Sequence, residues 1–458
     1  MPQLIIFSTQ ILNPTMSLNV IIKLKQSMNQ KCFFCSIIAM AIMSFLFISN
    51  SQATVNYPAV EAHSLIRYQT PKSSEWHFDK LEKDTPIHFN FRGENYDVGT
   101  IHKDSIILSK QTSEGRFIAY GYDTAMLDDE FAYPSQPIHQ LTVTPFAQTF
   151  SQPKTNELFI TTKPISLYTK ADINSAVFGT LSENVRYPIN ANLIDQSGNH
   201  WHQIFLAGNI VYVNSKDVEI DKGISVLTFH HILEDTENRL YRGVSTTTSV
   251  DAFKNQMAHL KSLGYETITL DELYQFLKKE RNLPSKVFVI TFDDGLKSVH
   301  KYGYPILKDL EYQATVFMIT SRIKRHTANW QPDSLQFMSL AEIEEAKSVF
   351  NYQSHSHFLH KLHNKKPIIF QRTERVIEYD VERSIRALRQ FNPSVYYFAY
   401  PFGAFDTKAL NAVKAAGIKM AFSTVKGRVK PGDNLLKLKR IYLLSSDSLS
   451  IVEDKILN

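Results

Sequence analysis

From residue 224 onward, short apolar runs alternate with stretches in which apolar residues recur at helical spacing. We predict a buried strand for each apolar run, at 225–229, 267–270, 286–292, 314–320, 351–355, 396–400 and 419–423. The helical stretches between them lie at 249–263, 271–280, near 299–310, and at 341–350, 371–390 and 407–417. This alternation predicts parallel β/α units. About seven units in roughly 235 residues favour an α/β chain folded as a closed or nearly closed barrel over an open sheet.

The preceding part of the chain has a different pattern. Residues 154–221 contain short strand-like pieces separated by Gly, Asn, Asp and Ser, which predicts a small all-β barrel. The Leu167-Tyr168 strand and the ending at 208–213 resemble a bacterial SH3-like domain. That resemblance implies a module that binds cell-wall polymers, with a spacer as the alternative.

Residues 54–150 are polar with short alternating pieces, so we expect a β-rich region without a chemical motif. The predicted domain order is therefore a leader at 1–53, a β-rich region at 54–152, an SH3-like domain at 153–222 and a barrel at 223–458.

The leader contains an apolar run at 32–48 that follows three lysines and precedes the string SQA at 51–53. This order is typical of a secretory signal peptide, and we expect cleavage after Ala53 in preference to retention as a membrane anchor. Since no second apolar run of spanning length occurs, we predict a secreted or periplasmic protein of the cell envelope, with no membrane span in the mature chain.

Composition narrows the function further. The 458 residues are 43% hydrophobic and 21% charged, which suits a chain with a sizeable core. The net charge is +5, and residues 1–53 hold three lysines and no acid, so the remainder carries only +2. So small an excess argues against nucleic acid as a partner.

Both cysteines, Cys32 and Cys35, lie inside the apolar run, and we interpret their C-x-x-C spacing as coincidental. Without the leader, any metal must rely on histidine and carboxylate ligands.

Four polar motifs directly follow predicted strands, where a β/α barrel places its chemistry. The first is TFDDG at 291–295. Asp293 and Asp294 are adjacent and point in different directions, so one can hold a metal while the other accepts a proton. The alternative is an acid pair at a helix N-terminus, where it favours the helix dipole.

The second motif is SHSHFLH at 354–360. His355 and His360 are five positions apart, so they converge only if the chain turns between them. His357 or His363 can replace one of them, and a solvated histidine cluster is the alternative.

The third motif, FAYPFG at 398–403, is a turn whose backbone N–H can stabilise an oxyanion, or an ordinary β-to-α turn. The fourth, LTFHH at 227–231, offers His230 or His231 as a general acid, with a buried structural histidine as the alternative.

Together the motifs supply a carboxylate and two imidazoles for a divalent metal, a second carboxylate as base, a histidine as acid and a backbone donor. That set forms a complete hydrolytic site. Two histidines and one aspartate leave open coordination positions, which is typical of a catalytic metal centre. Zn²⁺ is the default metal, with Fe²⁺, Co²⁺ or Ni²⁺ as alternatives.

This order of motifs resembles the polysaccharide deacetylase family, also called the NodB-homology or carbohydrate esterase 4 family, over about 224–458. TFDDG is the most telling string, and the histidine pair and FAYPFG support it. The resemblance implies removal of N- or O-acetyl groups from sugar polymers on a distorted β/α barrel. The histidine spacing, His230, and the lack of any histidine after His363 look most like the poly-N-acetylglucosamine deacetylase branch.

By this resemblance Asp293 is the catalytic base, His230 the leading candidate for the acid, and the N–H of Phe402 the oxyanion donor. The implied metal ligands are Asp294, His355 and His360. One position departs from the family pattern: the turn motif often begins with an arginine that braces the base, and here that position is Ala399. We suggest Arg440 as a substitute.

The sequence therefore predicts a metal-dependent hydrolase that acts on carbon–nitrogen bonds other than peptide bonds and releases acetate. Its partner would be an acetylated polysaccharide or cell-wall glycan: poly-N-acetylglucosamine, peptidoglycan or a chitin-like chain. One rival is an inactive cell-wall or glycan-binding protein that acts through 153–222. Another is a non-haem iron oxygenase, because two histidines and a carboxylate also suit Fe(II), although that chemistry usually occurs on an all-β scaffold.

Overall fold

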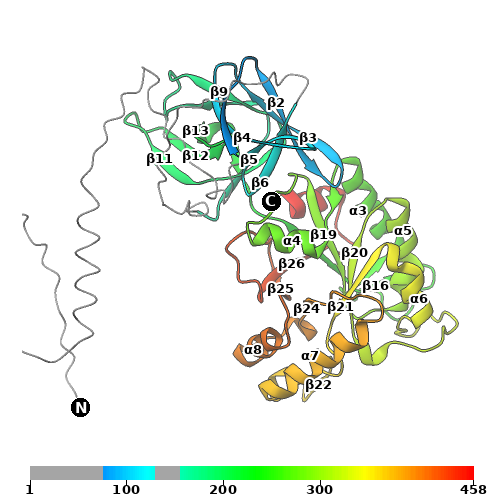
Figure 1. Ribbon diagram of the computed structural model, residues 1–458. Helices are drawn as coiled ribbons and strands as arrows, with labels where there is room; N and C mark the ends of the chain where they lie inside the picture. The colour runs from blue at the N-terminus through cyan, green and yellow to red at the C-terminus, as the bar shows by residue number, and fades with distance from the viewer. Residues whose placement is uncertain (1–75, 129–154, 458) are drawn as a thin grey trace, which may run out of the picture. The chain divides into compact units, whose positions relative to one another are not determined.

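The computed structural model describes residues 76–128 and 155–457 (Figure 1). The predicted leader at 1–53, with Cys32 and Cys35, lies outside these residues. Within the described ranges, no helix combines the length and apolar character needed to cross a membrane.

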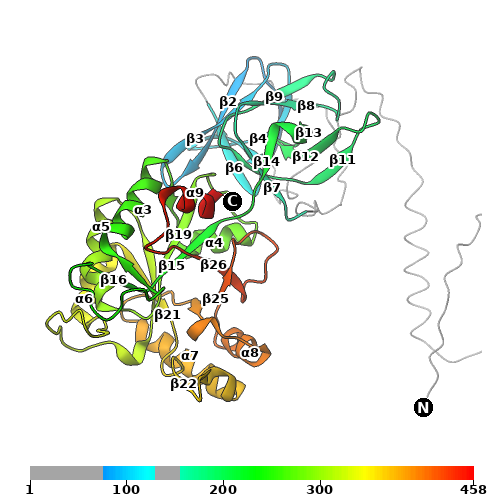
Figure 2. The same ribbon diagram turned by 180° about the vertical axis from the view of Figure 1, so that it is seen from behind.

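A ring of parallel strands forms the C-terminal half of the described chain (Figure 1, Figure 2). In ring order its seven strands are β15 (Ser225–Phe229), β26 (Leu438–Tyr442), β25 (Met420–Lys426), β24 (Tyr397–Ala399), β21 (Phe350–Ser354), β20 (Ala314–Met318) and β19 (Val287–Phe292). The ring is closed because β15 pairs with both β26 and β19. Every residue of β15, β19 and β20 is buried, as expected for strands covered on both faces. The predicted β/α barrel is confirmed.

Helices follow the strands and pack around them (Figure 1). They are α3 (Val250–Ser262), α4 (Leu270–Leu277), α5 (Tyr304–Asp309), α6 (Leu340–Glu345), α7 (Glu374–Leu388), α8 (Thr407–Ala415) and α9 (Leu449–Leu457). In α7 the predicted apolar face at Val381, Ile385 and Leu388 is buried. Helices α4 and α6 begin with capping boxes, in which a Thr or Ser and a Glu three residues later satisfy free N–H groups.

Two predicted elements are shorter than expected. The run TITL was expected as a strand, but only its first residue belongs to β18 (Glu266–Thr267), because Thr269 already caps α4. The helix expected at 341–350 ends at Glu345 and continues as a 3-10 turn (Ala346–Ser348) before Phe350 begins β21. In the first place the N-cap of α4 outweighs the apolar period.

The pattern did not predict β26, α9, or the short parallel pair β16 (His231–Leu233) and β17 (Thr247–Ser249). In β26, Lys439 is exposed and Arg440 is buried, so the strand lacks the continuous apolar run of its neighbours.

The N-terminal half of the described chain is all β. Its first group of strands is β1 (Trp76–Lys80), β2 (Thr85–Phe91), β3 (Glu94–Ile101), β4 (Ile106–Thr112), β5 (Gly115–Tyr120) and β6 (Asp123–Leu127). The second is β7 (Leu158–Thr161), β8 (Ile165–Tyr168), β9 (Val177–Leu181), β10 (Arg186–Pro188), β11 (Ala191–Ile194), β12 (His200–Leu206), β13 (Asn209–Asn214) and β14 (Val218–Ile220). Strand β3 pairs with β9, and β5 pairs with β12, so one sheet continues across the predicted boundary near 152. The SH3-like assignment stays a prediction.

A buried arginine of this β-rich half, held by an ion pair, bonds to the barrel. Arg186 Nε donates to Asp221 Oδ2 at 2.7 Å, and both side chains are 3% exposed. The same guanidinium donates to the carbonyls of Pro284 and Ser285. These partners precede β15 and β19, whereas the predicted site residues follow those strands. The β-rich half is therefore fixed at the end of the barrel away from the predicted site.

We predict that Arg186→Ala lowers the free energy of unfolding by about 3–5 kcal/mol, because Asp221 would stay buried without its cation. Urea denaturation measures the change. The control is Arg386→Ala, which removes an exposed i,i+4 pair with Glu382 and should cost less than about 0.5 kcal/mol. Equal, small effects of both variants would show that the Arg186 side chain does not hold the two halves together.

Candidate metal and catalytic site

The four predicted motifs meet at one end of the barrel, because parallel strands all end there. Asp293 and Asp294 follow β19, and the 354–360 loop begins at the end of β21. His230 follows β15, and the Pro401–Gly403 turn comes directly after β24 and Tyr400.

Asp294, His355 and His360 form a compact cluster whose ligand atoms all lie within 4.8 Å of one another. Asp294 Oδ1 lies 3.2 Å from His360 Nε2 and 3.5 Å from His355 Nε2. That oxygen is buried and makes no hydrogen bond within the described residues. Three ligand atoms that converge on one point, one of them a buried oxygen without a donor, fit a divalent cation.

Both imidazoles in the cluster are in the form that binds metal. Burial lowers the pKa of His355 to about 4, and burial also lowers the pKa of His360 to about 4. Both rings are therefore neutral at pH 7. The Nδ1 of His355 lies 2.7 Å from the Ala399 carbonyl oxygen, so Nδ1 carries the proton and Nε2 presents its lone pair to the cluster.

Asp293, next to the cluster, is held by Arg440. The two guanidinium nitrogens Nη1 and Nη2 donate to Oδ1 and Oδ2 of Asp293, each at 2.8 Å, and both side chains are buried. Burial alone would raise the pKa of Asp293, but the Arg440 guanidinium and the neighbouring imidazoles hold it well below its usual range. Arg440 is itself fixed by a hydrogen bond from Nε to the Ser423 carbonyl at 3.0 Å. It thus makes the contact that Ala399 cannot make.

The structure separates the two histidines of the LTFHH motif. His230 Nε2 lies 3.7 Å from Asp293 Oδ2, and the His230 ring stacks on Tyr442 with centroids 6.0 Å apart. His231 is buried against Tyr241 instead. Of the two candidates for a general acid, only His230 lies beside Asp293.

The other histidines of the second motif lie outside the cluster. His357 Nδ1 pairs with Thr320 Oγ1 at 2.8 Å, and His363 Nδ1 pairs with Gln371 Oε1 at 2.7 Å.

Asp380 of α7, which the sequence analysis missed, accepts the N–H groups of His357 and Phe358 at 2.8 and 2.7 Å. Its signal in the sequence was an acid on the buried face of an amphipathic helix. These bonds hold the turn that lets His355 and His360 converge.

Phe402 lies in the turn after β24 with a left-handed backbone (φ 58°, ψ 16°). The next residue, Gly403, has φ 66°, and a Cβ there would lie 2.7 Å from the Thr424 Cβ, so only glycine fits. The Gly403 N–H donates to the Tyr400 carbonyl at 2.8 Å, which closes the turn. The Phe402 ring packs on His360, with centroids 4.2 Å apart.

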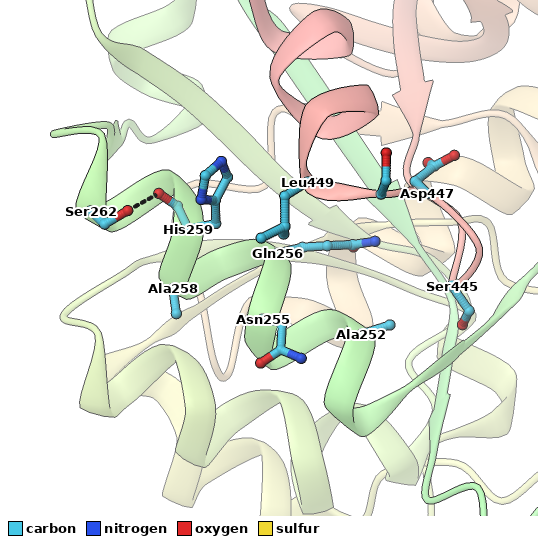
Figure 3. Close-up of a pocket in the computed structure, with 10 residues that line it drawn as sticks. Ala252, Asn255, Gln256, Ala258, His259, Ser262, Ser445, Asp447 and Leu449 are labelled. Carbon is cyan, nitrogen blue, oxygen red and sulfur yellow. Dashed lines mark hydrogen bonds between the residues drawn. The ribbon is translucent and has the colours of Figure 1, made fainter.

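A separate hollow of about 530 Å³ lies between α3 and the segment around Ser445–Leu449 (Figure 3). Its polar groups largely pair with one another or with nearby backbone. His259 Nε2 lies 2.6 Å from Glu453 Oε1, and Ser262 donates to the His259 carbonyl. None of the predicted site residues lines this hollow, so we place the chemistry at the metal cluster.

The chain is similar to known polysaccharide deacetylases. A family model described as polysaccharide deacetylase matches residues 280–421. Over 206 residues the chain is 31% identical to the poly-beta-1,6-N-acetyl-D-glucosamine N-deacetylase of Staphylococcus aureus (strain MSSA476), covering 44% of this chain and 69% of that relative. The Staphylococcus epidermidis protein of the same name is 27% identical over 200 residues, covering 43% of this chain and 67% of its own.

Among solved structures, a Streptococcus pyogenes deacetylase in complex with acetate aligns with a TM-score of 0.45 and 24% identity, over 51% of this chain and 97% of that chain.

We predict that Asp294→Asn or His355→Ala abolishes zinc binding, because each removes one of three converging ligand atoms. Metal content is measured by mass spectrometry after loading with zinc and desalting. His357→Ala is the matched control, since His357 lies in the same loop but outside the cluster, and it should retain zinc. If the Asp294 and His355 variants retained zinc and the His357 variant lost it, the zinc ligands would not be the three residues named here.

Proposed function

The chain belongs to the polysaccharide deacetylase family, and we propose that it is a metal-dependent N-deacetylase that hydrolyses acetamide groups of an N-acetylglucosamine-containing glycan. The observation that supports this most is the meeting of a three-ligand cluster with an arginine-held carboxylate at the barrel mouth. Groups of three histidine or carboxylate side chains also occur without a catalytic role, but an ionised carboxylate beside the cluster adds a candidate general base.

Asp294, His355 and His360 would hold the metal, and Zn²⁺ is the default for two imidazoles and a carboxylate. When bound, the ion polarises a carbonyl and makes a water more acidic. The three protein ligands leave coordination positions open for these groups.

In the proposed mechanism, each remaining site residue either transfers one proton or stabilises one charge. Asp293, which its depressed pKa keeps ionised, accepts the proton of the attacking water, and Arg440 holds its carboxylate in a fixed plane. The Phe402 N–H donates to the oxygen on which negative charge develops. His230, 3.7 Å from Asp293, gives a proton to the leaving nitrogen. The water oxygen joins the acyl carbon as the C–N bond breaks, which yields acetate and an amine on the polymer.

We propose further that the protein acts on the outside of the cell, on an acetylated polysaccharide or cell-wall glycan. The pattern of the leader at 1–53 supports secretion, and the relatives named above are deacetylases of poly-N-acetylglucosamine by their names. The SH3-like pattern of 153–222 supports a wall-facing role for the β-rich half.

We expect the zinc-loaded protein to release acetate from N-acetylglucosamine oligomers, and Asp293→Asn to lower the rate by about 10²–10⁴ while zinc content is unchanged. An enzymatic acetate assay and a metal measurement on the same samples test both points. His363→Ala is the control, since His363 is exposed and its ring bonds to Gln371 rather than to any site residue described here.

Two outcomes would contradict this assignment. If the Asp293→Asn protein lacked metal and the Asp294→Asn protein retained it, the roles assigned to the two acids would have to be exchanged. A wild-type protein that holds zinc and retains glycan but releases no acetate would favour the binding protein that acts through 153–222.

A further inference from the structure

The two histidines of the metal cluster are oriented in different ways. His355 has its Nδ1 fixed by the Ala399 carbonyl at 2.7 Å. A metal-ligating histidine is normally fixed in this manner, since the hydrogen bond at one nitrogen aims the other. His360 has no comparable bond: within the described residues, its ring makes no hydrogen bond to another residue. Its ring bonds to the backbone of His360 itself, so a neighbouring residue that holds its orientation must do so by packing.

Ring packing supplies that contact. The His360 imidazole packs against two rings, Phe402 at 4.2 Å and His355 at 4.8 Å between centroids. The planes of His360 and Phe402 are 35° apart, so they face each other more than they meet edge to edge. Phe402 is 41% exposed, so burial in the hydrophobic core explains little of why a phenylalanine occupies this position.

The position of the Phe402 ring is in turn set by its backbone. The left-handed conformation of Phe402, the close approach of Gly403 to Thr424 and the bond from the Ala404 N–H to the Pro401 carbonyl leave this turn little freedom. A rigid turn therefore fixes the point and direction from which the Phe402 side chain extends. The segment from Ala399 to Gly403 consequently touches both imidazoles, one through a carbonyl oxygen and the other through an aromatic face.

We infer that the Phe402 side chain is a positioning residue that orients His360 for metal binding, in place of the hydrogen bond that orients His355. This role belongs to the ring and is separate from that of the Phe402 N–H, which the alanine, tyrosine and leucine variants used below all keep. The inference rests on the metal site of the proposed function. An imidazole without this packing would lose more rotational freedom when it binds a cation, and its affinity for the cation would fall.

The test is the dissociation constant for Zn²⁺, measured without substrate by competition with a chromogenic chelator. We expect Phe402→Ala to raise it by about 10–100-fold, the usual effect of losing a group that orients a ligand. Phe402→Tyr keeps the ring and should restore wild-type affinity. The absorption spectrum of the Co²⁺-loaded protein reports ligand geometry, and it should change in the alanine variant and return in the tyrosine variant.

Phe358→Ala is the matched control. Phe358 lies in the same loop as the ligands and is 47% exposed, but its ring packs on His357, with centroids 4.3 Å apart, and His357 is outside the cluster. Zinc affinity in this variant should equal that of the wild type. A Phe402→Ala protein with unchanged zinc affinity and cobalt spectrum would overturn the inference, as would equal losses in the Phe358 and Phe402 variants.

The failure of the proposed function would look different, because then the wild-type protein itself would bind no zinc or release no acetate. Should the alanine variant fold poorly by circular dichroism, Phe402→Leu takes its place, since leucine keeps apolar bulk but has no flat face. Wild-type affinity in the leucine variant would also overturn the inference.

Discussion

A carboxylate that has lost its water stays ionised only if a cation or hydrogen-bond donors replace that water, and Arg440 supplies both for Asp293. This contact depends on closure of the barrel. Asp293 follows β19, Arg440 lies in β26, and β15 pairs with both strands. An open sheet would separate the last strand from the first, and the acid would be buried without a partner. Stable folding and the proposed chemistry therefore both require that the barrel closes and brings Arg440 to Asp293.

The metal cluster depends on a second set of contacts, made by backbone groups and packed rings. Asp380 fixes the histidine loop through two N–H groups, and the segment from Ala399 to Gly403 contacts both imidazoles. The ligands thus converge because two segments that are rigid for independent reasons lie against each other. Preorganisation of this kind lowers the entropy lost when a cation or substrate binds.

The β-rich half contributes in another way. Arg186 and Asp221 link it to segments that enter β15 and β19, and one cluster of buried apolar side chains includes both Ile87 of β2 and Phe276 of α4. Since those strands end at His230 and Asp293, the β-rich half supports the site from the opposite end of the same strands. If it binds a glycan, as proposed, it does so as a fixed part of the protein.

The sequence by itself determined the barrel and the end at which its chemistry lies. Strands buried on both faces must be apolar throughout, so runs such as KVFVI and ATVFM were visible, and the polar motifs after them stood out. It did not determine which histidines converge, because His355, His357, His360 and His363 lie within nine residues and only the turn held by Asp380 selects two of them. The brace from Arg440, 147 residues from Asp293, and the packing of Phe402 on His360 were decided by tertiary structure. Local patterns record which face of an element is buried, whereas such contacts depend on which strand lies beside which once the ring has closed.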